Sequence, residues 1–237
     1  MNKADKRRQS LVFIPGWNIR AEFLANFAEK FADYELHYFT PPPVIDGDAY
    51  QQAADALQKF SAGRNIIAPL LLGWSMGGQL ALLAARELRP RAVLLVNSAA
   101  IFSRDTEAQK SFYLACQKDF HGAVKHFLRL MDNTPDENLL LQKYFIDDKT
   151  SALNYLRALH TADLTDIVRG GHYPLGILHA RADKIISFSE AEYLRSLRPD
   201  AAWQEIVDAK HCPFFSRCDK ITNLLDKVAH GQKSKKI

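Results

Sequence analysis

Residues 70–82 read LLLGWSMGGQLAL, and this stretch decides the fold. Residues 70–72 are apolar enough for a buried strand, and the leucines and alanines at the other end are typical of a buried helix. Between them, Gly73 to Gly77 fit the pattern G-x-S-x-G, in which a serine lies on a sharp turn from strand to helix and exposes its hydroxyl. Such a turn needs glycine where a side chain would collide with the neighbouring backbone. The stretch therefore predicts a strand–turn–helix unit with Ser75 at its tip; the alternative is a buried turn with an inert serine.

The positive charge of the chain is concentrated at its two ends. The 237 residues carry a net charge of +4, and residues 1–8 and 231–237 each hold a net +3, which leaves −2 for residues 9–230. A basic excess confined to two tails argues against a nucleic-acid-binding surface on the body. The length fits one large domain, with 47% hydrophobic and 24% charged residues as in ordinary globular proteins.

Neither a membrane span nor a signal peptide is expected. The first residues are charged, and they are not followed by the longer apolar run that forms the core of a signal peptide. Residues 65–85 are uncharged, but Pro69 and the glycines of the turn favour a strand–turn–helix unit over a span. The number of cysteines is odd and their spacing does not suit a metal, which predicts reduced thiols in a cytoplasmic protein. These cysteines are Cys116, Cys212 and Cys218. We further expect a monomer without metal or cofactor.

Strand-like segments alternate with helical ones over most of the chain. This rhythm predicts an α/β fold, a mostly parallel sheet with helices on both faces. Sites in such sheets form at the carboxyl ends of strands, where Trp17, Ser75 and Asn97 are expected. The predicted strands are 11–14, 36–39, the run before Ser75, 92–96, 174–179 and 203–207. The predicted helices include an amphipathic one through Phe23, Leu24, Phe27 and Phe31, and others at 50–60, 190–197 and 221–228.

The rhythm changes between residues 104 and 168, where several helical segments follow one another without a strand. We expect a helical lid inserted into a core formed by residues 9–103 and 169–230, with basic tails at 1–8 and 231–237. Apolar residues from 112 to 131 recur at the spacing of one helix. The opposite face of that helix is basic, although a solvated surface is the simpler interpretation. The basic face comprises Lys118, His121, Lys125 and Arg129.

A serine on such a turn needs a base and a carboxylate that orients the base. Asp183 and His211 follow the last two predicted strands, in the chain order Ser, Asp, His that is typical of this arrangement. We therefore predict Ser75, Asp183 and His211 as catalytic residues. The backbone N–H groups of Met76 and Trp17 are the predicted oxyanion hole. Competing candidates for the carboxylate are Asp163, Asp166 and Asp208.

These residues resemble the α/β-hydrolase family over nearly the whole chain, and within it the esterases that act on pimeloyl-acyl-carrier protein methyl ester in biotin synthesis. The segments that carry the resemblance are PGW at 15–17, GWSMGG at 73–78, LLVNS at 94–98, FHGAVKHFLRLM at 120–131 and KHCPF at 210–214. Two features depart from it: Pro15 stands where relatives usually have histidine, and the sheet is expected to be smaller.

The resemblance implies a serine carboxylesterase that hydrolyses the methyl ester of a pimeloyl chain carried by acyl-carrier protein. It also implies an acyl pocket and a basic carrier-docking surface on the lid. The implied pocket residues are Trp17, Met76, Phe127, Leu128, Arg129, Leu130 and Met131; the docking residues would be Lys118, Lys125, Arg129, Lys143 and Arg157. Two alternatives stay open: a general short-chain carboxylesterase or thioesterase with the same triad, and a non-catalytic acyl-binding protein on a hydrolase scaffold.

Overall fold

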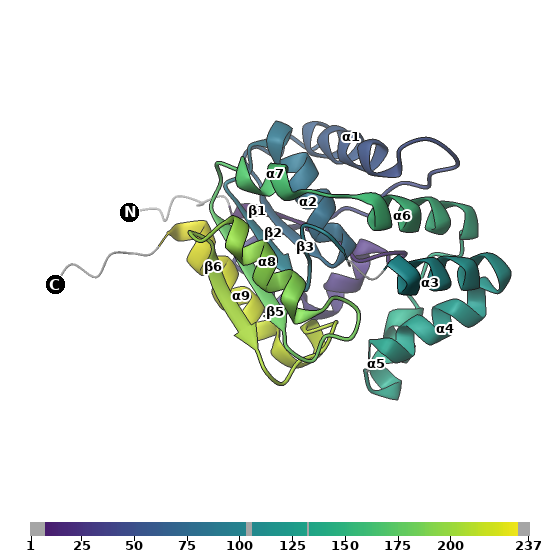
Figure 1. The fold of residues 1–237 in the computed structure, drawn as a ribbon. Coiled ribbons are helices and arrows are strands. Elements are labelled where there is room, and N and C mark those ends of the chain that lie inside the picture. The colour runs from purple at the N-terminus through teal and green to yellow at the C-terminus, as the bar shows by residue number, and fades with distance from the viewer. Residues whose placement is uncertain (1–7, 103–105, 132, 232–237) are drawn as a thin grey trace, which may run out of the picture.

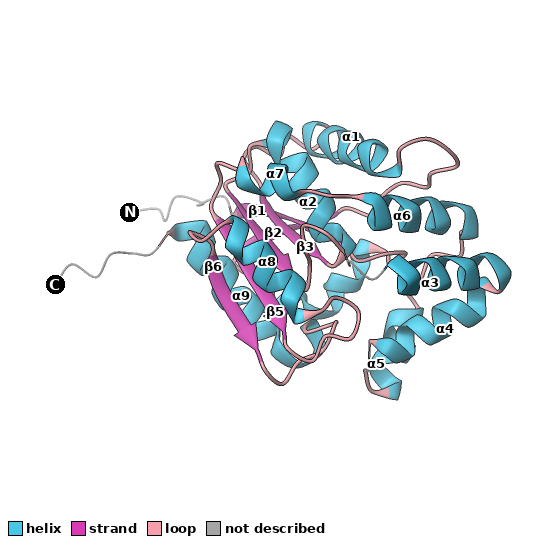
Figure 2. Ribbon diagram, viewed as in Figure 1, coloured by secondary structure: helices cyan, strands magenta, loops and turns pink. Residues whose placement is uncertain are grey.

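The computed structural model describes residues 8–102, 106–131 and 133–231. The predicted basic tails therefore lie outside the described residues, apart from Arg8 and Gly231. Within these described residues, six parallel strands form one sheet at the centre of the molecule (Figures 1 and 2). They are β1 (Gln9–Ile14), β2 (Tyr34–Tyr38), β3 (Leu70–Trp74), β4 (Ala92–Val96), β5 (Leu175–Ala180) and β6 (Ala202–Ile206), in the spatial order β2-β1-β3-β4-β5-β6.

Helices cover both faces of this sheet. On one face α2 packs against β1, β3 and β4, with α1 outside it and α7 and α8 beside it (Figure 1). On the other face α9 packs against β4, β5 and β6 and contacts η1. The predicted α/β architecture is confirmed. The helices are η1 (Ala21–Phe31), α1 (Ala49–Ala62), α2 (Met76–Leu88), α3 (Thr106–Lys118), α4 (Phe120–Leu130), α5 (Pro135–Gln142), α6 (Lys149–Thr161), α7 (Thr165–Arg169), α8 (Phe188–Leu197) and α9 (Phe214–His230).

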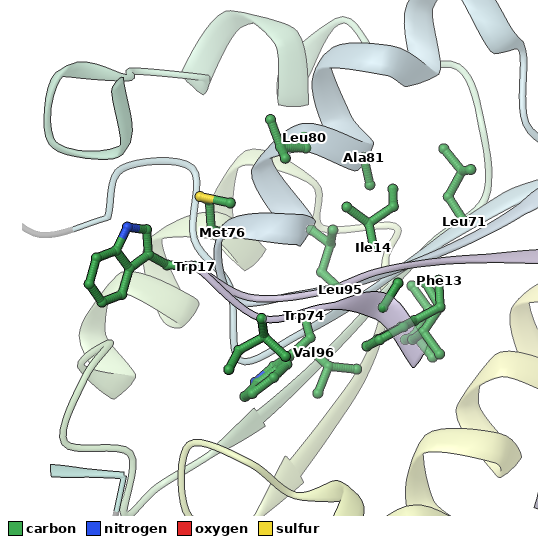
Figure 3. Close-up of a cluster of buried hydrophobic side chains, with 14 of the residues drawn as sticks. Phe13, Ile14, Trp17, Leu71, Trp74, Met76, Leu80, Ala81, Leu95 and Val96 are labelled. Atoms are coloured by element: carbon green, nitrogen blue, oxygen red, sulfur yellow. The ribbon is translucent and has the colours of Figure 1, made fainter. Parts of the chain in front are cut away.

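The strand before Ser75 lies in the middle of the sheet, as its continuous apolar sequence predicts. All five residues of β3 are buried, and the strand pairs with β1 on one side and β4 on the other. Phe13, Leu71, Trp74 and Leu95 from these strands form part of the core in Figure 3. Full burial of one such side chain contributes about 1.5–3 kcal/mol, so this packing holds the end of β3 at a fixed place.

The helix predicted through Phe23 and Phe31 is present, but it is a 3₁₀ helix over Ala21–Phe31 and not an α-helix. Isolated 3₁₀ helices of this length are uncommon because their hydrogen bonds are poorly aligned. Here the aromatic side chains are packed from several directions: Phe23 contacts Phe27 and Phe214 at ring-centre distances of 5.4 and 6.1 Å. Tertiary packing therefore stabilises a helix that local preference alone disfavours.

The single helix predicted across residues 112–131 is wrong. Asp119 separates α3 from α4: its backbone is extended, with φ −141° and ψ 91°, and its carboxylate accepts the N–H of Gly122 at 2.9 Å. Asp119 is thus the N-cap of a new helix. Because the chain changes direction here, Lys118 belongs to α3 while Lys125 and Arg129 belong to α4, and the basic residues do not share one helix face.

Helices α3–α6, which we call the lid group, follow one another beyond the carboxyl ends of the strands (Figure 1). Ile101 before the group and Asp163 after it form an antiparallel bridge, and the N–H of Leu164 donates to the carbonyl of Ala100 at 3.0 Å. The chain therefore leaves and re-enters the core at neighbouring points. The α7 helix begins inside the predicted limits 104–168 but ends at Arg169, and it packs against α2 and α8. The boundaries of a lid stay a prediction. Among the described helices, none has the length and apolarity needed to span a membrane.

Candidate active site

Ser75 lies on a strained turn between β3 and α2. Its backbone has φ 55° and ψ −123°, a conformation that residues with a side chain rarely adopt. Close packing of the backbone holds it there: a Cβ on Gly77 would lie 2.1 Å from the carbonyl oxygen of Ile14, and one on Gly73 would lie 2.5 Å from the carbonyl oxygen of Gly77. Glycine is thus required on both sides of the serine because no space is left for a side chain.

Three predicted side chains meet at this turn. The Nε2 atom of His211 lies 3.0 Å from the Ser75 hydroxyl oxygen, and its Nδ1 atom lies 2.8 Å from a carboxylate oxygen of Asp183. All three residues are buried. The carboxylate requires a proton on Nδ1, which leaves the Nε2 lone pair facing the serine hydroxyl. This arrangement can remove the hydroxyl proton as the oxygen attacks an electrophile.

The backbone of His211 is held by two buried residues at the ends of neighbouring strands. The Nε1 of Trp74 donates to the His211 carbonyl at 2.8 Å, and the Nδ2 of Asn97 donates to the same carbonyl at 2.9 Å and to that of Lys210 at 2.7 Å. The other end of the Asn97 amide accepts the N–H of Ala180 at 2.9 Å. Asn97 therefore ties β4, the end of β5 and the His211 loop together, a role that sequence reasoning did not assign to it.

Asp183 is the carboxylate that reaches the histidine, as predicted. Its second oxygen accepts the backbone N–H groups of Ile185 and Ile186 at 2.8 and 3.0 Å, which fixes the rotamer of the carboxylate. The three competing carboxylates have other contacts. Asp163 accepts the N–H of Thr165, Asp166 is exposed beside Arg169, and Asp208 pairs with Arg217.

The predicted oxyanion donors lie on the two segments nearest Ser75. Met76 is the first residue of α2, so its N–H has no carbonyl partner within the helix. The loop after β1 passes close to the serine: a Cβ on Gly16 would lie 3.3 Å from the Ser75 Cβ. Asn18, with φ 60°, fixes this loop by exchanging hydrogen bonds with Ile146, whose N–H donates to the Asn18 carbonyl at 3.0 Å. Trp17 lies between Gly16 and Asn18 in this loop, and Figure 3 shows its side chain together with that of Met76.

A cavity of about 390 Å³ opens above Ser75, between the sheet edge and the lid group. Trp17 lines it: its Nε1 donates to the Ala152 carbonyl at 2.9 Å, and its ring packs edge-on against Phe112 and Phe127. The cavity is mainly apolar, and its lining residues in the described part of the chain include no carboxylate. The other lining residues are Phe102, Ala108, Gln109, Ser111, Ala115, His126, Leu130, Leu156, Leu159, His160, Lys184 and Ile185.

The structure brings only some of the predicted pocket residues to this cavity. Trp17, Phe127 and Leu130 line the cavity, as does Ser75. Leu128 and Met131 are buried in the packing behind it, and the Arg129 side chain is exposed to solvent. In an α-helix, neighbouring residues point about 100° apart, so a consecutive run cannot share one wall. Met76 lines a different cavity, of about 330 Å³, beside Gly16 and Tyr155.

Most of the cavity was missed from the sequence because seven separate segments build it. Phe112 was recognised as apolar at helical spacing, but its partners on α6 and the 184–185 loop gave no comparable signal.

Burial lowers the pKa of His160, in the cavity wall, to about 4, so its imidazole is neutral near pH 7. Burial likewise raises the pKa of the Cys212 thiol well above its usual value. Among the described residues no cluster of His, Cys, Asp and Glu could hold a metal ion.

The five residues predicted to dock a carrier protein all have exposed side chains. Lys118 ends α3, Lys125 and Arg129 lie on α4, Lys143 follows α5 and Arg157 lies on α6. The Arg157 guanidinium donates to the hydroxyl of Tyr113 at 2.8 Å, so this cation is oriented along the α3–α6 contact. The residues are thus distributed over four parts of the lid group.

The sequence pattern of the Alpha/beta hydrolase family matches residues 11–223, and the chain belongs to this family. Membership confirms the predicted class of enzyme, a hydrolase. The chain is 24% identical to the pimeloyl-[acyl-carrier protein] methyl ester esterase of Cronobacter sakazakii, over 93% of this chain and 94% of that protein. It is also 24% identical to the Serratia marcescens protein of the same name, over 92% of each.

Solved structures show the same fold at lower sequence identity. An esterase from Exiguobacterium antarcticum superimposes with a TM-score of 0.83 at 18% identity, covering 94% of this chain and 92% of its own. The closeness in structure at such low identity reflects a shared arrangement of core elements, since packing tolerates many sequences of similar pattern.

Proposed function

We propose that the protein is a serine carboxylesterase that hydrolyses the methyl ester of pimeloyl-acyl-carrier protein. The observation that carries the ester hydrolysis is the row of hydrogen bonds from Asp183 through His211 to Ser75 on the floor of a mainly apolar cavity. The more specific substrate is supported by the similarity to esterases of that name over more than nine-tenths of the chain.

In the proposed mechanism Ser75 attacks the ester carbonyl while His211 takes the hydroxyl proton. The N–H groups of Met76 and Trp17 donate to the oxyanion that forms, and each such donor is worth on the order of a hundred- to a thousand-fold in rate. His211 then gives its proton to the departing methoxide, and methanol leaves an acyl-enzyme. A water molecule, deprotonated by His211, attacks the acyl carbonyl; the carboxylic acid leaves and Ser75 regains its proton.

The lid group has two proposed roles in this reaction. Its cavity wall, with Phe112, Phe127 and Leu156, binds the methylene chain of the acyl group, each buried methylene contributing about 0.8 kcal/mol. Its outer surface, with Lys125 and Arg129, attracts the acidic carrier protein. Lysine offers a point charge, whereas the guanidinium of arginine can form two parallel hydrogen bonds. The proposal therefore extends to attraction by charge and not to specific paired contacts.

The test compares two substrates on the purified protein. We expect kcat/KM to be much higher for pimeloyl-acyl-carrier protein methyl ester than for a short-chain p-nitrophenyl ester. A fluorophosphonate probe should label Ser75 in the native protein. Activity on the small ester alone would reject the carrier substrate and retain the esterase. Absence of both activity and label in folded protein would reject an enzyme altogether and favour an acyl-binding role.

A further inference from the structure

His179 is a buried histidine behind the Asp183 carboxylate with no part in the mechanism above. It lies in β5, four residues before Asp183, and its side chain is 0% exposed. Its Nε2 atom lies 3.1 Å from the carbonyl oxygen of Ile186 and 3.8 Å from the Asp183 oxygen that bonds His211. A buried histidine usually has both ring nitrogens paired, yet Nδ1 of His179 has no hydrogen-bond partner among the described residues. Its place next to the triad therefore calls for an explanation.

The contacts of His179 form one chain with those of the triad. Its Nε2–H donates to the carbonyl of Ile186, and the N–H of Ile186 donates to Asp183 at 3.0 Å. The other oxygen of Asp183 bonds His211, which in turn faces Ser75. Each hydrogen bond fixes the next group, so His179 anchors the turn that aims the carboxylate.

The tautomer and charge of His179 follow from its surroundings. A carbonyl only accepts, so the proton of the neutral ring must be on Nε2, and the unpaired Nδ1 carries a lone pair. Burial lowers the pKa of His179, and the nearby His211 acts in the same direction, whereas Asp183 and the bond to Ile186 oppose the shift. The groups that face the ring are Asp183, His211, Ile186 and Phe188, the last at a ring-centre distance of 6.1 Å. A neutral ring leaves the charge of the carboxylate available to His211.

We propose that His179 is a positioning residue of the active site: its Nε2–H holds the 183–186 turn so that the Asp183 carboxylate meets Nδ1 of His211. This inference rests on the proposed catalytic roles of Ser75, Asp183 and His211. Its consequence is that loss of the Nε2–H should impair turnover without impairing substrate binding, because His179 does not line the cavity.

The experiment compares three variants. His179→Phe keeps a ring but loses the donor, and His179→Gln can place an amide N–H near the position of Nε2. The matched control is His37→Phe. His37 is also a strand histidine with one buried ring nitrogen that makes no hydrogen bond to any described residue; this nitrogen lies 3.8 Å from the carboxylate of Glu35, but the residue belongs to β2, away from the triad. We expect the kcat of His179→Phe to fall about tenfold to a hundredfold, with KM within about twofold of the wild-type value. His179→Gln should recover most of the lost kcat, and His37→Phe should keep the wild-type kcat.

An unchanged kcat in His179→Phe would overturn the proposal, as would equal losses in His179→Phe and His179→Gln or a matching loss in His37→Phe. If the variants do not fold, the wild-type protein still decides: ¹⁵N NMR should place the His179 proton on Nε2, coupled to the Ile186 carbonyl, and a proton on Nδ1 would reject the proposal. The low-field proton of His211 Nδ1–H should shift in His179→Phe and not in His37→Phe. This signal needs no turnover, so it separates failure of this inference from failure of the proposed esterase activity.

Discussion

At the carboxyl edge of the sheet, backbone and buried polar groups fix each side chain, whereas the cavity wall from α3, α4 and α6 is held mainly by packing of apolar side chains. Asp183 accepts two N–H groups, and the His211 carbonyl receives two side-chain donors. By contrast, Phe127 is held by ring contacts with Trp17 and Phe112 at 5.4 and 5.8 Å. A hydrogen bond forms only over a narrow range of distances and angles, whereas apolar packing tolerates many arrangements of the side chains. We therefore expect the edge to carry out the proposed chemistry and the lid group to select the substrate.

The strongest test of this contrast is Ser75→Ala. It should reduce kcat/KM for a p-nitrophenyl ester by about 10⁴-fold or more, because it removes the proposed nucleophile and leaves only the rest of the site. The melting temperature should stay the same or rise, since the strained turn itself is retained. Ser61→Ala, at a buried serine in α1, is the control and should keep its activity. Retention of a tenth of the activity by Ser75→Ala would locate the chemistry elsewhere.

Within the lid group, Phe127→Ala and Leu128→Ala separate the cavity from the packing behind it. Both residues are buried, so each truncation should cost about 3 kcal/mol of unfolding free energy in urea titrations. Only Phe127 lines the cavity, and its loss should lower kcat/KM for acyl esters about tenfold. An equal kinetic effect of the two variants would mean that the wall acts through overall stability and not through contact with the acyl chain.

A smaller effect is expected from charge on the outside of the lid group. Reversal of both α4 cations, Lys125→Glu with Arg129→Glu, should raise KM for the carrier-bound ester about tenfold at low salt and leave the p-nitrophenyl ester unaffected. Lys220→Glu on α9 is the control, because it changes net charge on the core. If the control raises KM as much, or if the small ester is affected too, docking on α4 is rejected.

The last test measures stability alone and concerns His160 in the cavity wall. Its pKa is lowered from 6.5 to about 4 by burial, so the unfolded chain takes up a proton between these values while the folded protein does not. Its contribution to stability is thus complete above pH 6.5 and is lost as the pH falls toward 4. His160→Phe should therefore show a shallower loss of unfolding free energy between pH 6.5 and 4. If the unfolding free energy falls equally steeply with pH in both proteins, burial does not lower the pKa of the His160 imidazole.

Much of the carboxyl edge could be predicted from the sequence because its signals are local. The glycines around Ser75 follow from the lack of space for a Cβ, and the positions of Asp183 and His211 follow from strand ends that meet at one edge of a parallel sheet. The structure brings these three side chains into contact; their catalytic role stays a prediction. The break at Asp119 also had a local signal, an N-capping residue, which the apolar spacing of residues 112–131 concealed.

The sequence by itself determined the α/β fold, the strained turn and the order of the three side chains, because strand pattern, glycine and chain order depend on near neighbours. Only the tertiary structure decided which residues surround the cavity and which buried groups hold the triad in place. Asn97 and Trp74 reach the carbonyl of His211 from more than a hundred residues away. Lys184 and Leu156 likewise share a cavity across separate segments. Such contacts depend on how distant elements pack, which no local pattern specifies.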